Sequence, residues 1–265
     1  MARQRTDSVL VVKFADESSR RTPDRLVVEE PMSIRLDGEL VATTMRTPGN
    51  DFELAAGFCF ADGLLNGMPV TGVRYCADGS AVESAFNVVT VETGGRAPTP
   101  TPRLGSTTSS CGLCGSQTLD ELVQRLSPLD NGRLPDFPIS TITSVPNVVA
   151  AEQPLFTDTG AVHAAAVFTI DGRIELVRED VGRHNAVDKV VGRLLLDGQL
   201  PAHEWGLFVS GRASFEMVQK AWAAGFGTVV SVSAPTALAV QTAKRAGITL
   251  YGFVRDGRAV RYSPG

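Results

Sequence analysis

The sequence predicts an α/β fold (α+β overall) in which a mixed sheet flanked by helices follows a smaller β-rich N-terminal part. The first half has the patterns of strands and hairpins, whereas from about residue 140 strands alternate with helices. Repeated βα units predict a parallel or mixed sheet covered by helices. The composition changes at Thr93. We therefore expect a β-rich part at 1–92, a flexible loop at 93–115 and an α/β domain at 116–265.

Length and composition are those of an ordinary globular protein. The chain has 265 residues, of which 43% are hydrophobic and 20% charged, enough for a sizeable core. A net charge of −4 argues against a generic nucleic-acid or membrane binder. No apolar run approaches the roughly 18 residues of a membrane helix, and the first residues lack a secretory signal. We expect a cytoplasmic protein with no nucleic acid or membrane as partner.

Hairpin and helix signals organise the first half of the chain. Asp37-Gly38 predicts a tight turn between two strands. Asn50 or Asp51 is suited to cap a helix whose apolar residues have helical spacing. Strands are expected over 9–14, 26–36, 39–45 and 82–91, and a helix over 50–65.

The second half of the chain alternates between the hydrophobic spacing of strands and that of helices. A hairpin is expected to turn at Asp171-Gly172. Strands are expected over 164–170, 173–177, 206–210, 228–233 and 248–254, and helices over 116–126, 185–196, 214–224 and 236–246. Because ligands bind beyond the C-terminal ends of strands in such sheets, we expect the functional residues there.

Two cysteines, Cys111 and Cys114, end a segment rich in proline, threonine and serine that begins at Thr93. Glycines beside them let the backbone turn tightly. A helix expected directly afterwards favours the thiolate, which is the reactive form of cysteine. The pattern indicates an accessible nucleophilic sulfur at the end of a long exposed loop.

Three chemistries compete for this pair. A structural zinc site needs four ligands and the pair supplies two, with the other cysteines and the histidines scattered, so we expect no metal. Thiol-disulfide exchange fits the spacing, although it favours a pair held directly after a strand. The third chemistry is a persulfide carrier, and the spacing alone does not separate it from redox exchange. Cys59 and Cys76 are expected to be core or surface thiols.

A second set of polar residues lies at three expected strand ends. Glycine admits a close ligand, and arginine with helix-start N–H groups binds phosphate. We therefore expect one anion-binding cleft there, with His184 in it. His163 fits either this cleft or a buried hydrogen-bonding role, and His203 is expected in a solvated loop. The other candidates are Gly182, Arg183, Asn185, Ser210 and Arg212.

At this point the sequence resembles the formate dehydrogenase accessory sulfurtransferase family, FdhD. The run Arg178–Lys189 is long enough to be specific, whereas the Cys111–Cys114 pair alone would not be. The resembling blocks run in order over residues 29–31, 45–49, 53–58, 110–115, 159–160, 163–165, 178–189, 210–212 and 231–236.

The resemblance implies a sulfur carrier that accepts sulfur from a cysteine desulfurase as a persulfide. It then sulfurates the molybdenum bis(molybdopterin guanine dinucleotide) cofactor before this enters formate dehydrogenase. Cys111 would carry the persulfide, with Cys114 as its companion. The family also implies a homodimer, a main domain similar to the cytidine deaminase fold, and cofactor binding by Phe253, Val254, Arg255, Asp256, Gly257 and Arg258.

The residues agree with the resemblance in part. Four arginines (Arg183, Arg212, Arg255 and Arg258) suit the pyrophosphate of a dinucleotide. Zinc deaminases need a His-x-Glu motif, whereas alanines follow His163, so the catalytic zinc of that fold is expected to be missing. A thiol-disulfide oxidoreductase and a non-catalytic chaperone that binds the cofactor remain open as alternatives.

Overall fold

The computed structural model describes residues 4–16, 18–76, 81–82, 84–99, 115–130, 132 and 134–264. Cys111 and Cys114 lie outside the described residues, together with most of the expected loop. The described part contains three sheets of two, four and six strands. No helix within it is long and apolar enough to cross a lipid bilayer.

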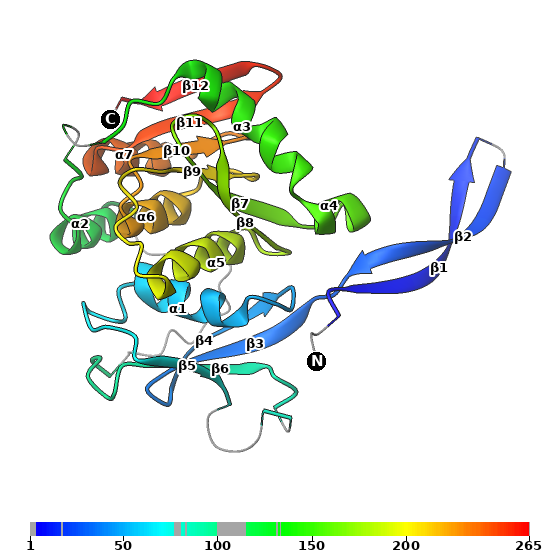
Figure 1. Cartoon of the computed structure of the whole chain (residues 1–265), viewed down its shortest axis with the longest axis horizontal. Coiled ribbons are helices and arrows are strands. Elements are labelled where there is room, and N and C mark those ends of the chain that lie inside the picture. Colours follow the sequence, from blue (N-terminus) through cyan, green and yellow to red (C-terminus); the bar gives the residue numbers. More distant parts are fainter. Residues whose placement is uncertain are drawn as a thin grey trace.

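An antiparallel ribbon of two strands projects from the body of the molecule (Figure 1). It consists of β1 (Thr6–Ala15) and β2 (Ser18–Val27), paired residue by residue over their whole length. The strand expected over 9–14 is confirmed, but β2 was missed. The single strand expected over 26–36 is wrong, because its first residues end β2. Polar β2 has little strand signal of its own and is extended because it pairs with β1.

A four-stranded sheet follows, in the order β4-β3-β6-β5. Its strands are β3 (Glu30–Leu36), β4 (Glu39–Arg46), β5 (Gly72–Tyr75) and β6 (Val88–Glu92). The hairpin expected at Asp37-Gly38 is confirmed. Helix α1 (Asp51–Ala61) covers this sheet and ends earlier than expected, and Asn50 makes no side-chain cap. The strand expected over 82–91 is shorter, because turns occupy the described residues before Asn87.

The large sheet has the order β12-β11-β10-β9-β7-β8. Strands β8, β9, β10 and β11 run in one direction, and β7 and β12 run antiparallel to their neighbours. The strands are β7 (His163–Phe168), β8 (Ile174–Asp180), β9 (Gly206–Val209), β10 (Thr228–Ser231), β11 (Thr249–Arg255) and β12 (Arg258–Ser263). The expected mixed sheet with flanking helices is confirmed.

Helices cover both faces of the large sheet. One face packs against α2 (Gly115–Arg125), α5 (Arg183–Leu196), α6 (Phe215–Ala224) and α7 (Ala237–Ala246). The other face packs against α3 (Ile139–Ala151), which leads into α4 (Pro154–Thr159). The four helices on the first face agree with the sequence prediction, whereas α3, α4 and β12 were missed. Helix α3 is rich in β-branched residues, and it is helical because Ile142, Val145 and Val149 bury one face of it on the sheet.

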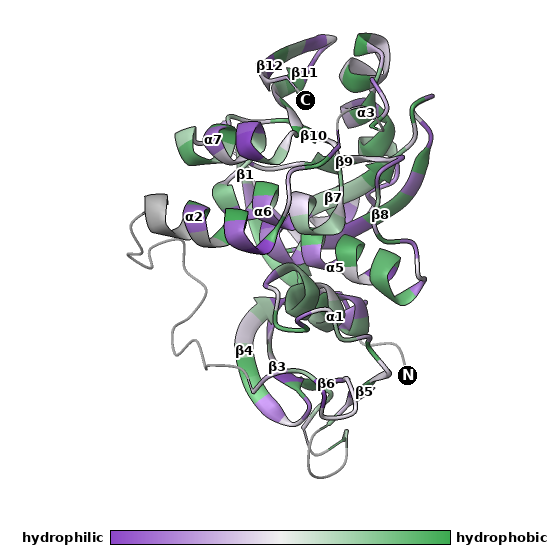
Figure 2. Ribbon diagram, turned by 90° about the vertical axis from the view of Figure 1, so that its left-hand side faces the viewer, coloured by the Kyte–Doolittle hydropathy of each residue, from purple (hydrophilic) through white to green (hydrophobic). Residues whose placement is uncertain are grey.

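Helices α1 and α5 join the two main sheets in a single stack (Figure 1). Figure 2 shows α1 largely hydrophobic between the small sheet and α5, as expected of a helix covered on both sides. The helices cross at Gly57 and Gly192: a methyl group on Gly57 would lie 1.9 Å from the Asp188 carbonyl oxygen. The two parts therefore pack backbone to backbone at this point. The expected division of the chain at residues 93 and 116 stays a prediction.

Buried ion pairs add to this interface. Lys189 on α5 lies 2.7 Å from Asp180 at the end of β8, and both side chains are fully buried. Asp180 also accepts a hydrogen bond from the backbone N–H of Thr47, and Arg178 donates to Glu53 on α1. Removing one partner of such a pair leaves a charge without compensation. These polar residues of the 45–49, 53–58 and 178–189 blocks therefore hold the two parts together.

Candidate functional site

The C-terminal ends of three parallel strands meet at one edge of the large sheet, as expected from the sequence, and the start of the antiparallel β7 lies at the same edge. His163 at the start of β7 pairs with Asp180 at the end of β8. Beyond β10, the Ser231 hydroxyl donates to the Gly211 carbonyl oxygen at 2.7 Å. We call the residues that gather at this edge the strand-end cluster: His163, Arg183, His184, Ser210, Gly211, Ser214 and Glu216.

Arg183 occupies the centre of the strand-end cluster, at the first turn of α5. A methyl group on Gly211 would lie 3.4 Å from its Cδ and 3.5 Å from the His163 ring. The Arg183 Nε atom is buried and has no hydrogen-bond partner among the described residues. A buried donor without a partner is costly, and the N-termini of α5 and α6 lie beside it. An anion would supply the partner that this atom lacks.

His163 borders Arg183 and contacts Ser210. Its Nδ1 lies 3.4 Å from the Ser210 hydroxyl, which accepts a hydrogen bond of 2.9 Å from the Ala164 N–H. Burial lowers the pKa of His163, and electrostatic interaction with Arg183 and His184 lowers it further. The imidazole is therefore neutral at pH 7, so that a nitrogen lone pair is available beside the arginine.

This shift predicts a pH dependence of stability. Because the pKa of His163 is lowered in the folded state, the unfolded chain binds more protons near its usual pKa. The contribution of His163 to stability is complete above that usual pKa and is lost as the pH falls through the folded value. We expect the melting temperature to fall between about pH 7.5 and about pH 5.5, and to fall less in His163→Gln. Exposed His203 offers the control, and an equal fall in wild type and His163→Gln would contradict the prediction.

His184 and Glu216 form a second pair in the strand-end cluster. The His184 Nε2 atom lies 3.5 Å from Glu216 Oε2, an ion-pair distance, and Ser214 donates to the same oxygen at 2.8 Å. The neighbouring His184 and the Ser214 hydroxyl lower the pKa of Glu216 to about 2. Glu216 is therefore negative at neutral pH and lies beside His184. Sequence reasoning missed Glu216, whose only signal was an acid in the first turn of α6.

Two predicted site residues, Asn185 and Gly182, form hydrogen bonds that stabilise the loop before α5 and do not face outward. The Asn185 side chain is buried, and its amide donates to the Met45 carbonyl oxygen at 2.8 Å and to Asp180 Oδ1 at 2.9 Å. The backbone N–H of Gly182 donates to the same Asp180 oxygen. These contacts tie the start of α5 to β4 and to the end of β8, and thereby position Arg183.

The predicted cofactor stretch Phe253–Arg258 forms the hairpin between β11 and β12. It lies at the same edge as the strand-end cluster, because the Phe253 N–H donates to the Ser233 carbonyl oxygen. Phe253, Arg255 and Arg258 are exposed, and Asp256-Gly257 makes the turn. Val254 is fully buried in the apolar core between the large sheet and α3, so its side chain is not available to a ligand.

Two cysteines of the described residues, Cys59 and Cys76, lie outside the strand-end cluster. Burial raises the pKa of Cys59 well above its usual value, which makes it an inert core thiol, as expected. Cys76 is half-buried beside Arg74. Within the described ranges no group of three or more His, Cys, Asp or Glu side chains is placed to hold a metal ion. Arg212 is exposed at the strand end next to Arg183.

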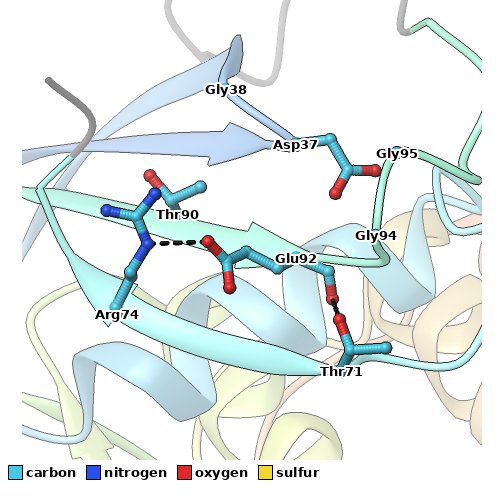
Figure 3. Close-up of a pocket in the computed structure, with 8 residues that line it drawn as sticks. All are labelled: Asp37, Gly38, Thr71, Arg74, Thr90, Glu92, Gly94 and Gly95. Atoms are coloured by element: carbon cyan, nitrogen blue, oxygen red, sulfur yellow. Dashed lines mark hydrogen bonds and ion pairs between the residues drawn. The ribbon is translucent and has the colours of Figure 1, made fainter.

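A separate pocket of about 520 Å³ opens on the small sheet (Figure 3). Its arginine and one of its acids already pair with each other, because Arg74 donates to Glu92 at 2.6 Å. Its other acid, Asp37, accepts a hydrogen bond of 2.7 Å from the Thr93 N–H. Thr93 is where the segment that leads to the two cysteines begins. The acid therefore fixes the base of that segment.

The fold and the site define an α/β protein in which the half-buried Arg183, whose Nε atom has no hydrogen-bond partner among the described residues, lies at the strand ends between two helix N-termini. The chain belongs to the FdhD/NarQ family, whose model matches residues 27–265. It is 46% identical over 258 residues to "Sulfur carrier protein FdhD" of Streptomyces coelicolor, covering 94% of this chain and 91% of the relative. It is 43% identical over 243 residues to the protein of that name from Mycobacterium tuberculosis, covering 88% and 87%.

The fold also matches a solved structure. A crystal structure from Desulfotalea psychrophila, assigned as a formate dehydrogenase accessory protein, superposes with a TM-score of 0.78. The match covers 98% of each chain at 24% sequence identity. At this identity the likeness establishes the fold.

Proposed function

We propose that this protein is a cytoplasmic sulfurtransferase that supplies sulfur for formate dehydrogenase. It accepts sulfur from a cysteine desulfurase as a persulfide on Cys111, with Cys114 as companion, and works as a homodimer. It transfers the sulfur to the molybdenum bis(molybdopterin guanine dinucleotide) cofactor, here a bound substrate, before the cofactor enters the dehydrogenase. The observation that supports this most is the 46% identity, over 258 residues, to a sulfur carrier protein.

The loading step needs no external oxidant. The Cys111 thiolate attacks the outer sulfur of the desulfurase persulfide, and a new sulfur–sulfur bond forms as the old one breaks. The desulfurase cysteine leaves as a thiolate, and Cys111 becomes the persulfide. The atoms and charges balance, and the sulfur keeps its oxidation state.

The strand-end cluster suits the other half of the reaction, which is binding the dinucleotide. The buried Arg183 Nε atom lacks a partner, and guanidinium groups bind pyrophosphate through several N–H groups at once. The first turns of α5 and α6 add N–H groups that favour negative charge. The exposed arginines 212, 255 and 258 at this edge extend the positive surface. We also propose that the large sheet shares the cytidine deaminase fold.

Replacing Cys111 with alanine tests the function. After incubation with a desulfurase and cysteine, wild-type protein is expected to gain about 32 Da, and a thiol reductant should remove this mass. Cys111→Ala should stay unmodified, because the atom proposed to accept the sulfur has been removed, and Cys76→Ala should load as wild type does. Sulfuration of the cofactor by Cys111→Ala at the wild-type rate would sink the proposal.

The same experiment separates the two alternatives. A thiol-disulfide oxidoreductase would form a reversible disulfide between Cys111 and Cys114, two hydrogens lighter than the dithiol, without a sulfur adduct. A chaperone that only binds the cofactor would tolerate loss of both cysteines. The strand-end cluster favours the chaperone over the oxidoreductase, because it provides an anion site that dithiol exchange does not need.

A further inference from the structure

Two ion pairs join α5 to α6, one below the other. At the rim of the strand-end cluster, the His184 Nε2 atom lies 3.5 Å from Glu216 Oε2. One helical turn further along both helices, the Lys220 ammonium lies 2.6 Å from Asp188 Oδ1. Residues four apart on a helix share a face, so the two pairs are stacked. The base is on α5 at the rim and on α6 in the deeper pair.

The deeper pair is closed off from water. The side chains of Lys220 and Asp188 are 6% and 3% exposed, and Lys220 also lies 3.8 Å from Asp62 at the end of α1. Burial raises the pKa of Asp188 to about 6, and Lys220 opposes this shift. Asp188 is therefore negative above about pH 7. Because buried charges are screened little by salt and water, this carboxylate acts on His184 one turn above it.

The rim pair is incomplete. The His184 Nε2 atom is buried and has no hydrogen-bond partner among the described residues, because its 3.5 Å separation from Glu216 exceeds an ordinary hydrogen bond. The Ser214 hydroxyl donates to the same Glu216 oxygen and holds it beside the imidazole. An imidazolium would form a charge-assisted bond to this oxygen. A proton on His184 would therefore strengthen the contact at the rim.

The second histidine of the strand-end cluster, His163, has different surroundings. Its polar neighbour is the Ser210 hydroxyl, which carries no charge. Burial and electrostatic interaction with Arg183 and His184 lower the pKa of His163, and Asp180 opposes this shift. The two imidazoles therefore differ: one faces carboxylates and the other an arginine. A proton that enters the cluster is held better by the first.

We propose that the strand-end cluster takes up one proton together with its anion and holds this proton on His184. Arg183 is the next residue in the chain, and its charge disfavours an imidazolium while no anion is bound. An anion paired with Arg183 cancels this effect, so His184 becomes a second cation at the site. Glu216 and Asp188 act as positioning residues that keep the proton there.

This inference rests on the anion site of the proposed function and adds a pH dependence to it. The charged and titratable groups around His184 are Arg183 and Asp188 on α5, Glu216 and Lys220 on α6, and His163 on β7. Because binding takes up a proton, the affinity for the anion rises as the pH falls, by up to about tenfold per pH unit. Without uptake the affinity would not change in this way.

Titration calorimetry of the full chain with guanosine diphosphate counts the proton. Measured at about pH 7.5 in buffers with different enthalpies of ionisation, wild type should take up about 0.5 to 1 proton. The terminal phosphate is ionised at this pH and contributes little. Binding should tighten about three- to tenfold from about pH 8 to about pH 7. His184→Gln should take up no proton, and His203→Gln, which changes an exposed histidine, should behave as wild type does.

The imidazole signals in NMR spectra locate the proton. The chain has three histidines, so single variants assign each ring. Addition of guanosine diphosphate at about pH 7.5 should shift the His184 signals to those of an imidazolium, and the His163 signals should stay those of a neutral ring. Glu216→Gln and Asp188→Asn should each reduce the uptake and flatten the pH profile. A merely structural role of these acids would lower stability and leave the profile unchanged.

Three results would overturn the inference while the proposed function stands. These are binding of guanosine diphosphate without proton uptake, uptake that persists in His184→Gln, and protonation of His163 in place of His184. A wild-type protein that does not bind the nucleotide would overturn the inference together with the proposed anion site. Sulfur loading of Cys111 is measured without the nucleotide, so a failure there is separate from all of these results.

Discussion

Replacing Arg183 with glutamine is expected to weaken binding of guanosine diphosphate, a fragment of the proposed substrate, by about 10- to 150-fold. Glutamine keeps a donor but loses the charge and the forked geometry, and hydrogen bonds to charged groups contribute about 1.5–3 kcal/mol. The effect should be at the high end of this range, because the Arg183 Nε atom is buried and unpartnered among the described residues. Titration calorimetry measures it directly.

Two further variants separate the role of Arg183 from the general effect of losing an arginine. Arg193→Gln removes an arginine from the same helix, near its C-terminal end, where Arg193 pairs with Asp197; it should bind the nucleotide as wild type does. Arg183→Lys keeps the charge without the fork, so it should bind with intermediate affinity. Equal affinities of wild type and Arg183→Gln would remove Arg183 from the binding site.

A methyl group at Gly192 is expected to lower the free energy of unfolding by at least about 4 kcal/mol. In an exposed helix the same change from glycine to alanine would stabilise by about 1 kcal/mol. Here the new Cβ would lie 1.8 Å from the Glu53 carbonyl oxygen and 2.8 Å from the Gly57 nitrogen. Both are backbone atoms, so α1 and α5 must move apart. The steric cost therefore exceeds the gain in helix propensity.

Denaturant unfolding of Gly192→Ala measures this loss. Gly198→Ala is the matched control, because it adds the same methyl just beyond the end of α5, where no atom lies within 4 Å. Gly198 has a positive φ of 68°, so the control should lose about 1–2 kcal/mol. A Gly192→Ala protein as stable as Gly198→Ala would mean that the helices separate at little cost.

Much of the fold follows from local patterns in the sequence. The apolar spacing over 185–196 predicted α5, and Asp37-Gly38 and Asp171-Gly172 predicted two hairpins that are confirmed. The gathering of Arg183 and Ser210 at one edge followed from a rule about parallel strands, which needs only the order of the elements. Periodicity shows which side of an element is buried, and that was enough for these predictions.

Elements that depend on a partner could not be predicted in this way. Strand β2 is polar, and α3 is rich in β-branched residues. Each takes its conformation from the strand or sheet against which it packs. Asn185 has the position of a binding residue, yet the structure uses its amide to join Met45 and Asp180. Its role depends on atoms far away in the sequence, which no local window contains.

The sequence by itself determined the family, the alternation of strands and helices, and the arginine at the start of α5. Only the tertiary structure decided that α1 meets α5 through two glycines, that Glu216 lies beside His184, and that the β1–β2 ribbon stands clear of the body. The physical reason is that these features depend on contacts between residues far apart in the sequence, such as that between Thr47 and Asp180. Such contacts form when separate elements pack, and the residues on either side of each partner do not specify them.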